Sequence, residues 1–101
     1  MNNIKPTSQS LRDTSFHDVT IRTTVKDLTQ AIGEPVYACN DGDDKSNYEW
    51  EAETADGIVF SVYDWKEYRR LKDTERISFH IGTHTPEQSW KVYDAIIKAL
   101  N

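Results

Sequence analysis

The sequence has little cysteine, glycine, proline or methionine: one, four, three and one residues among 101. The single cysteine, Cys39, excludes an intramolecular disulfide framework and is typical of a reducing compartment. No apolar run approaches the roughly 20 residues that a helix needs to span a bilayer. Residues 1–10 hold one lysine and no apolar stretch, so we expect no signal peptide. These absences predict a small cytoplasmic protein that has no membrane partner.

An excess of basic residues is also lacking. The chain has 17 acidic and 12 basic residues and a net charge of -5. This balance argues against generic nucleic-acid binding, which needs a basic surface. Eleven aromatic residues, three Trp, five Tyr and three Phe, argue against global disorder. The length allows one domain with one modest core.

The charge is unevenly distributed. Residues 39–56 hold seven acids and one base, whereas residues 64–76 hold five bases and four acids. The acidic stretch has two interpretations. It is either a solvated loop and strand, or an acidic surface that docks on a basic partner.

Capping signals predict two helices. Thr24 is an N-cap for a short helix over Val25–Ile32, which Gly33 ends. Thr85 is the N-cap of a C-terminal helix in which Pro86 occupies the first position. The apolar stripe of that second helix is expected to consist of Trp90, Tyr93, Ile97 and Leu100, widened by Val92 and Ile96.

Strict alternation predicts a β-hairpin. Apolar and polar residues alternate over 48–54 and again over 58–64. A two-residue loop would place glutamates on the core face, whereas a three-residue loop over 55–57 sets Trp50 opposite Val62. Because a slip of one residue turns every side chain to the other face, the three-residue loop is expected.

These elements predict an α+β fold. Two more strands are expected over 19–23 and 77–82, which gives an antiparallel sheet of three or four strands. The helices should cover one face and leave the other open. Residues 1–15 are expected to form a flexible arm, and residues 16–101 a single domain. The expected core consists of Leu28, Ile32, Trp50, Phe60, Val62, Ile77, Phe79, Ile81, Trp90, Tyr93 and Ile97.

The open face is the candidate partner surface. Aromatic side chains beside acids on an uncovered sheet are typical of a binding surface, although a solvated face with incidental aromatics is the alternative. A homodimer through this face, or through an edge strand, is a further alternative. Ser61 and Ser78 share the face; its partner-binding candidates are Glu49, Glu51, Glu53, Tyr63, Trp65 and His80.

Two alternatives involve small molecules. Arg69 and Arg70, together with the start of the second helix at Thr83, His84 and Thr85, would bind a nucleotide or another phosphorylated signal. His80 or His84 with a glutamate would make a small acid–base enzyme.

Neither alternative has a complete set of residues. Three glutamates on one strand face share one environment, whereas acid–base catalysis needs two environments that separate the pKa values. His80 and His84 lie on a strand end and a loop with no third metal ligand. We therefore expect no enzyme, no metal and no cofactor.

Three segments carry a resemblance. They are Leu28 to Pro35 with its Ala-Ile-Gly-Glu-Pro end, Tyr48-Glu49-Trp50-Glu51, and Val62 to Arg69 followed by His80-Ile81-Gly82. Over residues 16–100 the sequence resembles small uncharacterised accessory proteins of tailed bacteriophages. Such proteins often bind and block a host factor or sequester a defence signal, so the resemblance implies an inhibitor of a host protein in the host cytoplasm. The resemblance assigns no site residue.

Overall fold

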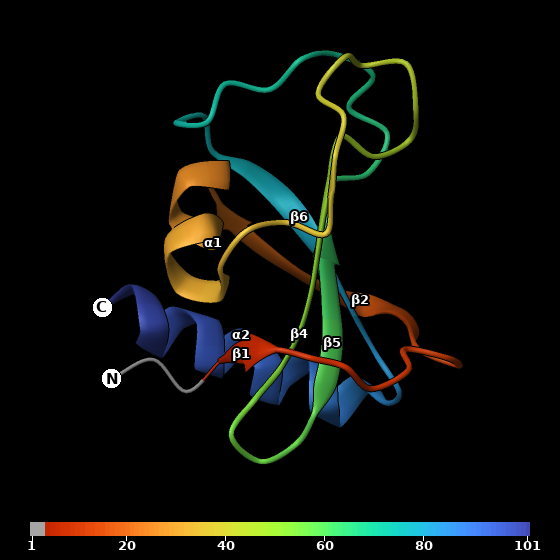
Figure 1. Cartoon of the computed structure of the whole chain (residues 1–101), viewed down its shortest axis with the longest axis vertical. Coiled ribbons are helices and arrows are strands. Elements are labelled where there is room, and N and C mark those ends of the chain that lie inside the picture. Colours follow the sequence, from red (N-terminus) through yellow and green to blue (C-terminus); the bar gives the residue numbers. More distant parts are fainter. Residues whose placement is uncertain (1–3) are drawn as a thin grey trace.

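Two helices lie on one side of an antiparallel sheet, and two long loops lie together beyond one end of it (Figure 1). The computed structural model describes residues 4–101. The helices are α1 (Val25–Ile32) and α2 (Pro86–Leu100). The strands are β1 (Lys5–Pro6), β2 (Ser15–Thr23), β3 (Tyr37–Ala38), β4 (Tyr48–Glu53), β5 (Val59–Tyr63) and β6 (Ile77–Thr83).

The fold class is the predicted α+β. The strand order is β1-β4-β5-β6-β2, and β3 also pairs with β4, so the described chain has six strands rather than three or four. The two additional strands, β1 and β3, are two residues long each. They cover the two halves of the outer edge of β4. Their shortness explains why no alternation marks them in the sequence.

The β4–β5 hairpin has the predicted register. Trp50 pairs with Val62, and Glu53 pairs with Val59. The amide of Thr54 donates to the Ile58 carbonyl at 3.0 Å, which leaves residues 55–57 as the loop. Gly57 has φ +85°, the left-handed conformation that the three-residue loop requires. Parity therefore selects the register that buries Trp50 and exposes the glutamates.

The buried stripe of α2 differs from the prediction. Trp90 is 56% exposed, whereas Val92 and Ile96 are fully buried. Tyr93, Ile97 and Leu100 are only partly buried. The buried side is turned by about one residue, toward Ser89, because α2 packs against β2, β6 and α1 through that side. The Ser89 hydroxyl, which is buried there, lies 2.6 Å from Thr83 Oγ1. Trp90 instead packs against Tyr93 on the outside, with ring centroids 5.7 Å apart.

The segment that the sequence assigns to a flexible arm lies against the sheet. Ile4 is buried at 6% exposure, and β1 pairs with β4. Residues 7–14 then lead from the β4 edge to β2 at the other edge, across the side opposite the helices (Figure 1). There Gln9 Nε2 donates to Glu53 Oε2 at 3.5 Å. Mobility of the arm in solution stays a prediction, and its first three residues lie outside the described part.

The uncovered face is therefore smaller than expected. Val59 and Ser61, which project from the same side as the glutamates, are buried at 6% and 7% exposure. They lie toward the end of the sheet where residues 7–14 cross. The opposite end, around Tyr63 and His80, stays accessible, since both side chains are partly exposed.

Candidate functional site

A row of paired residues crosses the open face. Directly paired residues of antiparallel strands project from the same side of a sheet. Tyr37 of β3 pairs with Glu49 of β4, and Glu49 pairs with Tyr63 of β5. On β6, His80 pairs with Tyr63 and also with Thr20 of β2. Five strands thus place one carboxylate between two tyrosines, with a histidine next in line.

Four rings form an aromatic cluster on this face: Phe16, Tyr63, Trp65 and His80. The rings of Phe16 and His80 stack at 3.8 Å between centroids and 13° between planes. Tyr63 and Trp65 lie 5.4 and 6.0 Å from the His80 ring and 6.0 Å from each other. Trp65 is 39% exposed. The structure brings together the three aromatic candidates that the sequence predicted.

Phe16 is the member that sequence reasoning missed. It precedes a register shift in β2 between Phe16 and Thr20, where Asp18 has φ +64°. This bulge interrupts the alternation, so the sequence pattern predicts a strand that begins only at Val19. Phe16 pairs with Gly82, and a Cβ at Gly82 would lie 2.7 Å from Ser61 Oγ and 3.8 Å from the Tyr63 ring. No local signal marks Phe16, because its partners Gly82 and His80 lie on β6 and meet it only through strand pairing.

The three glutamates of β4 lie beside the aromatic cluster. Glu49, Glu51 and Glu53 are each partly buried. Burial, followed by the hydrogen bond with Glu51 and the negative charge of that residue, raises the pKa of Glu49 to about 7. Burial, and then the charge of Glu49, raises the pKa of Tyr63 above its usual value. Burial lowers the pKa of His80.

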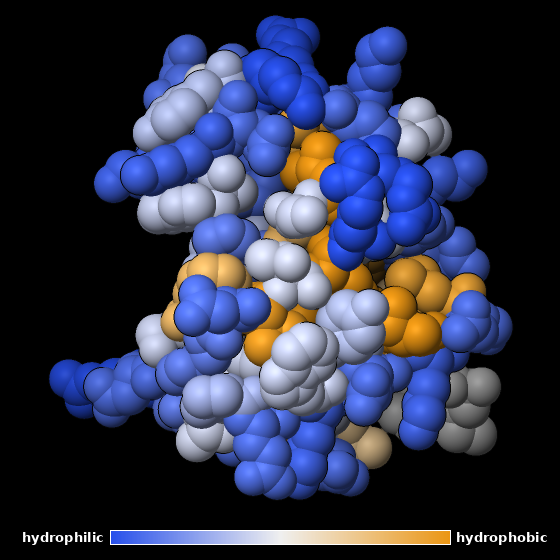
Figure 2. Space-filling model, turned by 180° about the vertical axis from the view of Figure 1, so that it is seen from behind, coloured by the Kyte–Doolittle hydropathy of each residue, from blue (hydrophilic) through white to orange (hydrophobic). Residues whose placement is uncertain are grey.

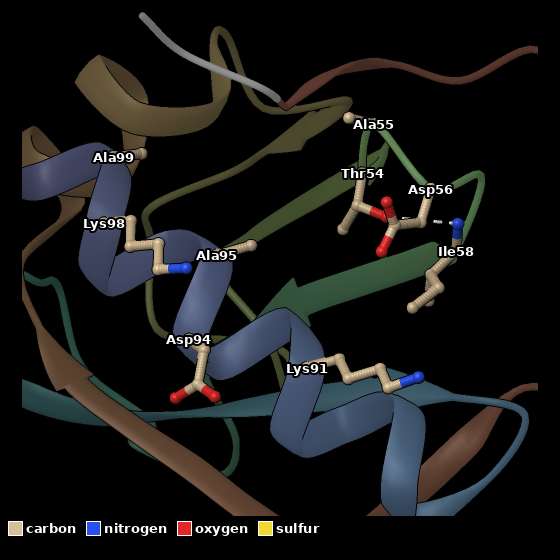
Figure 3. A pocket seen from close by; sticks show the side chains of 9 residues that line it. All are labelled: Thr54, Ala55, Asp56, Ile58, Lys91, Asp94, Ala95, Lys98 and Ala99. Carbon is tan, nitrogen blue, oxygen red and sulfur yellow. Dashed lines mark hydrogen bonds between the residues drawn. The ribbon is translucent and has the colours of Figure 1, made fainter.

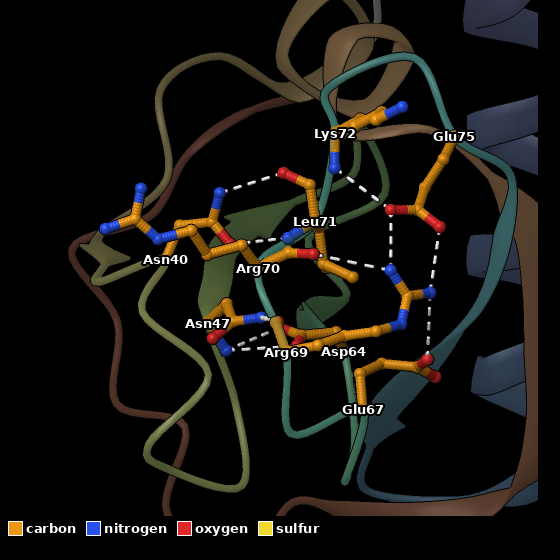
Figure 4. Close-up of polar contacts among 9 residues, drawn as sticks. All are labelled: Asn40, Asn47, Asp64, Glu67, Arg69, Arg70, Leu71, Lys72 and Glu75. Carbon is orange, nitrogen blue, oxygen red and sulfur yellow. Dashed lines mark hydrogen bonds and ion pairs between the residues drawn. The ribbon is translucent and has the colours of Figure 1, made fainter.

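Trp65 lies on the loop between β5 and β6, and polar contacts join this loop to the loop between β3 and β4. Figure 4 draws the contacts that Asn40, Asn47 and Asp64 make between them. Asp64, 1% exposed, accepts backbone N–H bonds from Asn47 and Tyr48, both with Oδ1 at 2.8 Å. Asn47 Nδ2 donates to the Arg69 carbonyl at 2.7 Å, and the Lys66 amide donates to the Lys45 carbonyl at 2.7 Å.

A second contact joins the same two loops. Asn40 exchanges hydrogen bonds with the backbone of Leu71, at 2.7 and 2.8 Å. Buried polar groups that are fully satisfied make a loop rigid. Trp65 is therefore presented on a fixed support.

The structure does not assemble the expected phosphate site. Arg69 binds Glu75 through two contacts of 2.8 Å, and the same ion pair lowers the pKa of Glu75 to about 2. Thr83 Oγ1 is buried and donates to the Thr85 carbonyl at 2.7 Å. The connection that carries Arg69 and Arg70 enters β6 at Ile77, whereas Thr83 ends it. Seven residues of strand separate these ends by about 20 Å.

Within the described chain, neither His80 nor His84 has a contact with a glutamate, the pair that the acid–base alternative requires. His80 is enclosed by the aromatic cluster, whereas His84 lies past the end of β6 with Nε2 3.0 Å from the Arg12 carbonyl. Between residues 4 and 101, no group of three His, Cys, Asp or Glu residues is placed to hold a metal ion. Neither helix in that range is long and apolar enough to cross a membrane.

Two hollows on the described surface, residues 4–101, bear on the candidate site. The larger, about 360 Å³, lies between α2 and the tip of the β4–β5 hairpin (Figure 3). It has charges of both signs, from Asp56, Asp94, Lys91 and Lys98, and it contains no predicted site residue. The smaller, about 330 Å³, adjoins the aromatic cluster and is lined by Tyr37, Asp44, Lys45, Ser46, Glu49 and Trp65.

Most of the surface is hydrophilic. Seen from behind, hydrophobic side chains gather in a band between hydrophilic margins (Figure 2). The remaining large exposed apolar side chains include Val36 at 61% and Tyr68 at 55%. Single exposed apolar residues are normal on a protein surface, so the aromatic cluster is distinguished by the proximity of its four rings.

No protein-family model, curated protein or solved structure matches the chain.

Proposed function

We propose that this chain is a non-catalytic binding protein that docks on a basic surface of a partner protein. The observation that carries the proposal is the aromatic cluster, which lies beside the β4 glutamates on a face that no helix covers. Aromatic residues bury much area at little entropic cost and are enriched at the centres of interfaces. The binding surface is defined as the aromatic cluster together with Glu49 and Glu51.

Charge complementarity favours a basic partner. The chain has a net charge of -5, and its densest acidic stretch includes β4. Complementary charge steers association and rejects partners of the same sign. Glu53 contributes less than the other two glutamates because Gln9 already contacts it.

The resemblance to phage accessory proteins supports a more specific proposal. The partner is then a host defence protein in the cytoplasm of a bacterial host, and binding inhibits it. Neither the nucleotide-binding nor the acid–base alternative has residues assembled in the structure, so neither is carried forward.

The test compares charge reversals on the binding surface with reversals elsewhere. Tagged protein is incubated with bacterial lysate, the bound protein is identified by native mass spectrometry, and its Kd is measured by calorimetry. The variant Glu49→Lys/Glu51→Lys should weaken binding by more than about 30-fold, since like charges at an interface cost several kcal/mol. Phe16→Ala, which removes the stacked ring, should weaken binding to a similar degree.

The matched control is Glu34→Lys/Asp94→Lys, which reverses two exposed charges, one directly after α1 and one on α2, that are not part of the defined binding surface. It should change Kd by less than about threefold. Equal losses in both double variants, or none in the first, contradict the proposal. A doubled mass without a foreign protein, abolished by Phe16→Ala, would instead show that the surface joins two copies of the chain.

A further inference from the structure

We propose that the hollow between Tyr37 and Trp65 receives an arginine side chain of the partner protein. This arginine anchors the partner at the end of the binding surface, so the inference rests on the function proposed above. The hollow, about 330 Å³, has two aromatic walls and two carboxylates among its lining residues. This volume lies near the lower end for ligand pockets, which suits one side chain.

The lining residues come from three parts of the fold. Tyr37 lies on β3 and pairs with Glu49, so both side chains project toward the open face. Trp65 follows β5 and contacts the aromatic cluster. Tyr37 and Trp65 are 41% and 39% exposed. The anchor is therefore reachable from solvent and continuous with the binding surface.

The Trp65 ring already attracts cations. The ammonium groups of Lys45 and Lys66 lie 5.8 and 5.7 Å from its centroid. These distances are close to the roughly 6 Å limit of a cation–π interaction, so both contacts are loose. Both lysines are exposed and are free to move aside.

An arginine fits this hollow better than a lysine. A guanidinium group is planar, stacks on an aromatic face and donates two parallel hydrogen bonds to one carboxylate. Glu49 is the carboxyl group beside both aromatic walls, and an entering guanidinium group would favour its ionised form; Asp44 adds a second carboxyl group. A phosphate or another anion would meet these carboxylates and be repelled.

The hollow is also preorganised. The Lys66 amide donates to the Lys45 carbonyl at 2.7 Å, and this bond joins the β5–β6 loop, which carries Trp65, to the β3–β4 loop. Asp64, directly before Trp65, is fixed by the backbone amides of Asn47 and Tyr48. A preformed site loses little entropy when a side chain enters it.

The test titrates N-acetyl-arginine amide into ¹⁵N-labelled protein and follows the tryptophan indole signals by NMR. Trp50, which is fully buried, and Trp90, on the outside of α2, are internal references. The Trp65 signal should shift in a saturable manner, whereas the uncharged citrulline analogue should leave it unchanged. The corresponding lysine amide should bind more weakly.

Variants separate a specific anchor from general attraction. Tyr37→Ala should raise the Kd of the arginine probe by about fivefold or more, whereas Tyr37→Phe, which keeps the ring, should stay within about twofold. Lys45→Ala should lower the Kd because it removes a competing cation. Lys26→Ala makes the same change in net charge at an exposed site on α1 and should leave the Kd unchanged.

The proposal is overturned if the arginine probe moves all three indole signals alike, or if citrulline binds equally well. Its failure is distinguishable from failure of the proposed function. If Tyr37→Ala leaves partner binding intact while Phe16→Ala abolishes it, the anchor is wrong and the binding surface stands. If Phe16→Ala has no effect on the partner, the proposed function fails whatever the probe shows.

Discussion

At Glu49 the cross-strand register forces a carboxylate between two tyrosines and beside a second glutamate. Its pKa is raised to about 7, first by burial and then by the hydrogen bond and charge of Glu51. The folded protein therefore holds a proton that the unfolded chain releases from about pH 4.5 upward. The contribution of Glu49 to stability is greatest at low pH, falls as the pH rises toward 7, and is lowest above that.

Replacing Glu49 with glutamine should remove this pH dependence. Relative to the native protein, Glu49→Gln should gain about 1 kcal/mol of unfolding free energy between pH 4.5 and pH 8, a value reduced for solvent screening at a half-buried site. Urea unfolding at several pH values measures the difference. Glu34→Gln, at an exposed site, serves as the control. A constant difference between Glu49→Gln and the native protein across this range would contradict the expectation.

At the scale of elements, the two long loops act as one support for Trp65. They approach each other tightly at Gly42, where a Cβ would lie 2.7 to 2.9 Å from backbone atoms of Arg69. Gly42 also has φ +79°. A side chain there is both strained and in collision with backbone, which cannot move without separating the loops.

Gly42→Ala should therefore destabilise the protein more than Gly57→Ala. Gly57 has φ +85° but open space around its Cβ position. Its replacement should cost about 1–2 kcal/mol from left-handed strain alone, and that of Gly42 at least about 1 kcal/mol more. Chemical denaturation gives both values, and the Trp65 indole signal should shift only in Gly42→Ala. Equal costs would mean that the two loops separate easily.

The elements also show where sequence reasoning succeeds. Thr24 and Thr85 accept hydrogen bonds from Asp27 and Gln88 amides, at 3.0 and 3.1 Å, as capping predicts. The prediction of which side of α2 is buried was wrong by about one residue. Hydrophobic residues recur at helical spacing on two adjacent sides of α2, and only the contacts with β2, β6 and α1 select one of these sides.

In the whole molecule, the two edges of the sheet are protected in two different ways. The β4 edge is covered by β1 and β3, whereas β2 has a bulge at Asp18, which makes a regular edge-to-edge pairing difficult. Ile4 joins the core beside β1, and residues 7–14 then cross the open face. The N-terminal segment thus limits how much of the face a partner can reach.

Ile4→Ala should loosen this segment. Loss of a buried isoleucine should cost about 2 kcal/mol, and amide hydrogen exchange should accelerate in β1 and at the edge of β4. Lys5→Ala, next to it and exposed, is the control. If the segment is instead the flexible arm that the sequence predicts, Ile4→Ala will alter neither stability nor exchange.

The local elements follow from the sequence alone: helix caps, the alternation of β4 and β5, and the hairpin parity that turns Glu49 outward. These depend on residues close together in the chain, so local steric and hydrogen-bonding rules suffice. Which distant residues meet depends on how the elements pack in three dimensions. Phe16 stacks on His80, Tyr37 pairs with Glu49, and Arg69 binds Glu75 far from Thr83. Strand order and the packing of α2 place these residues, and both depend on how the whole core is filled, which no short segment specifies.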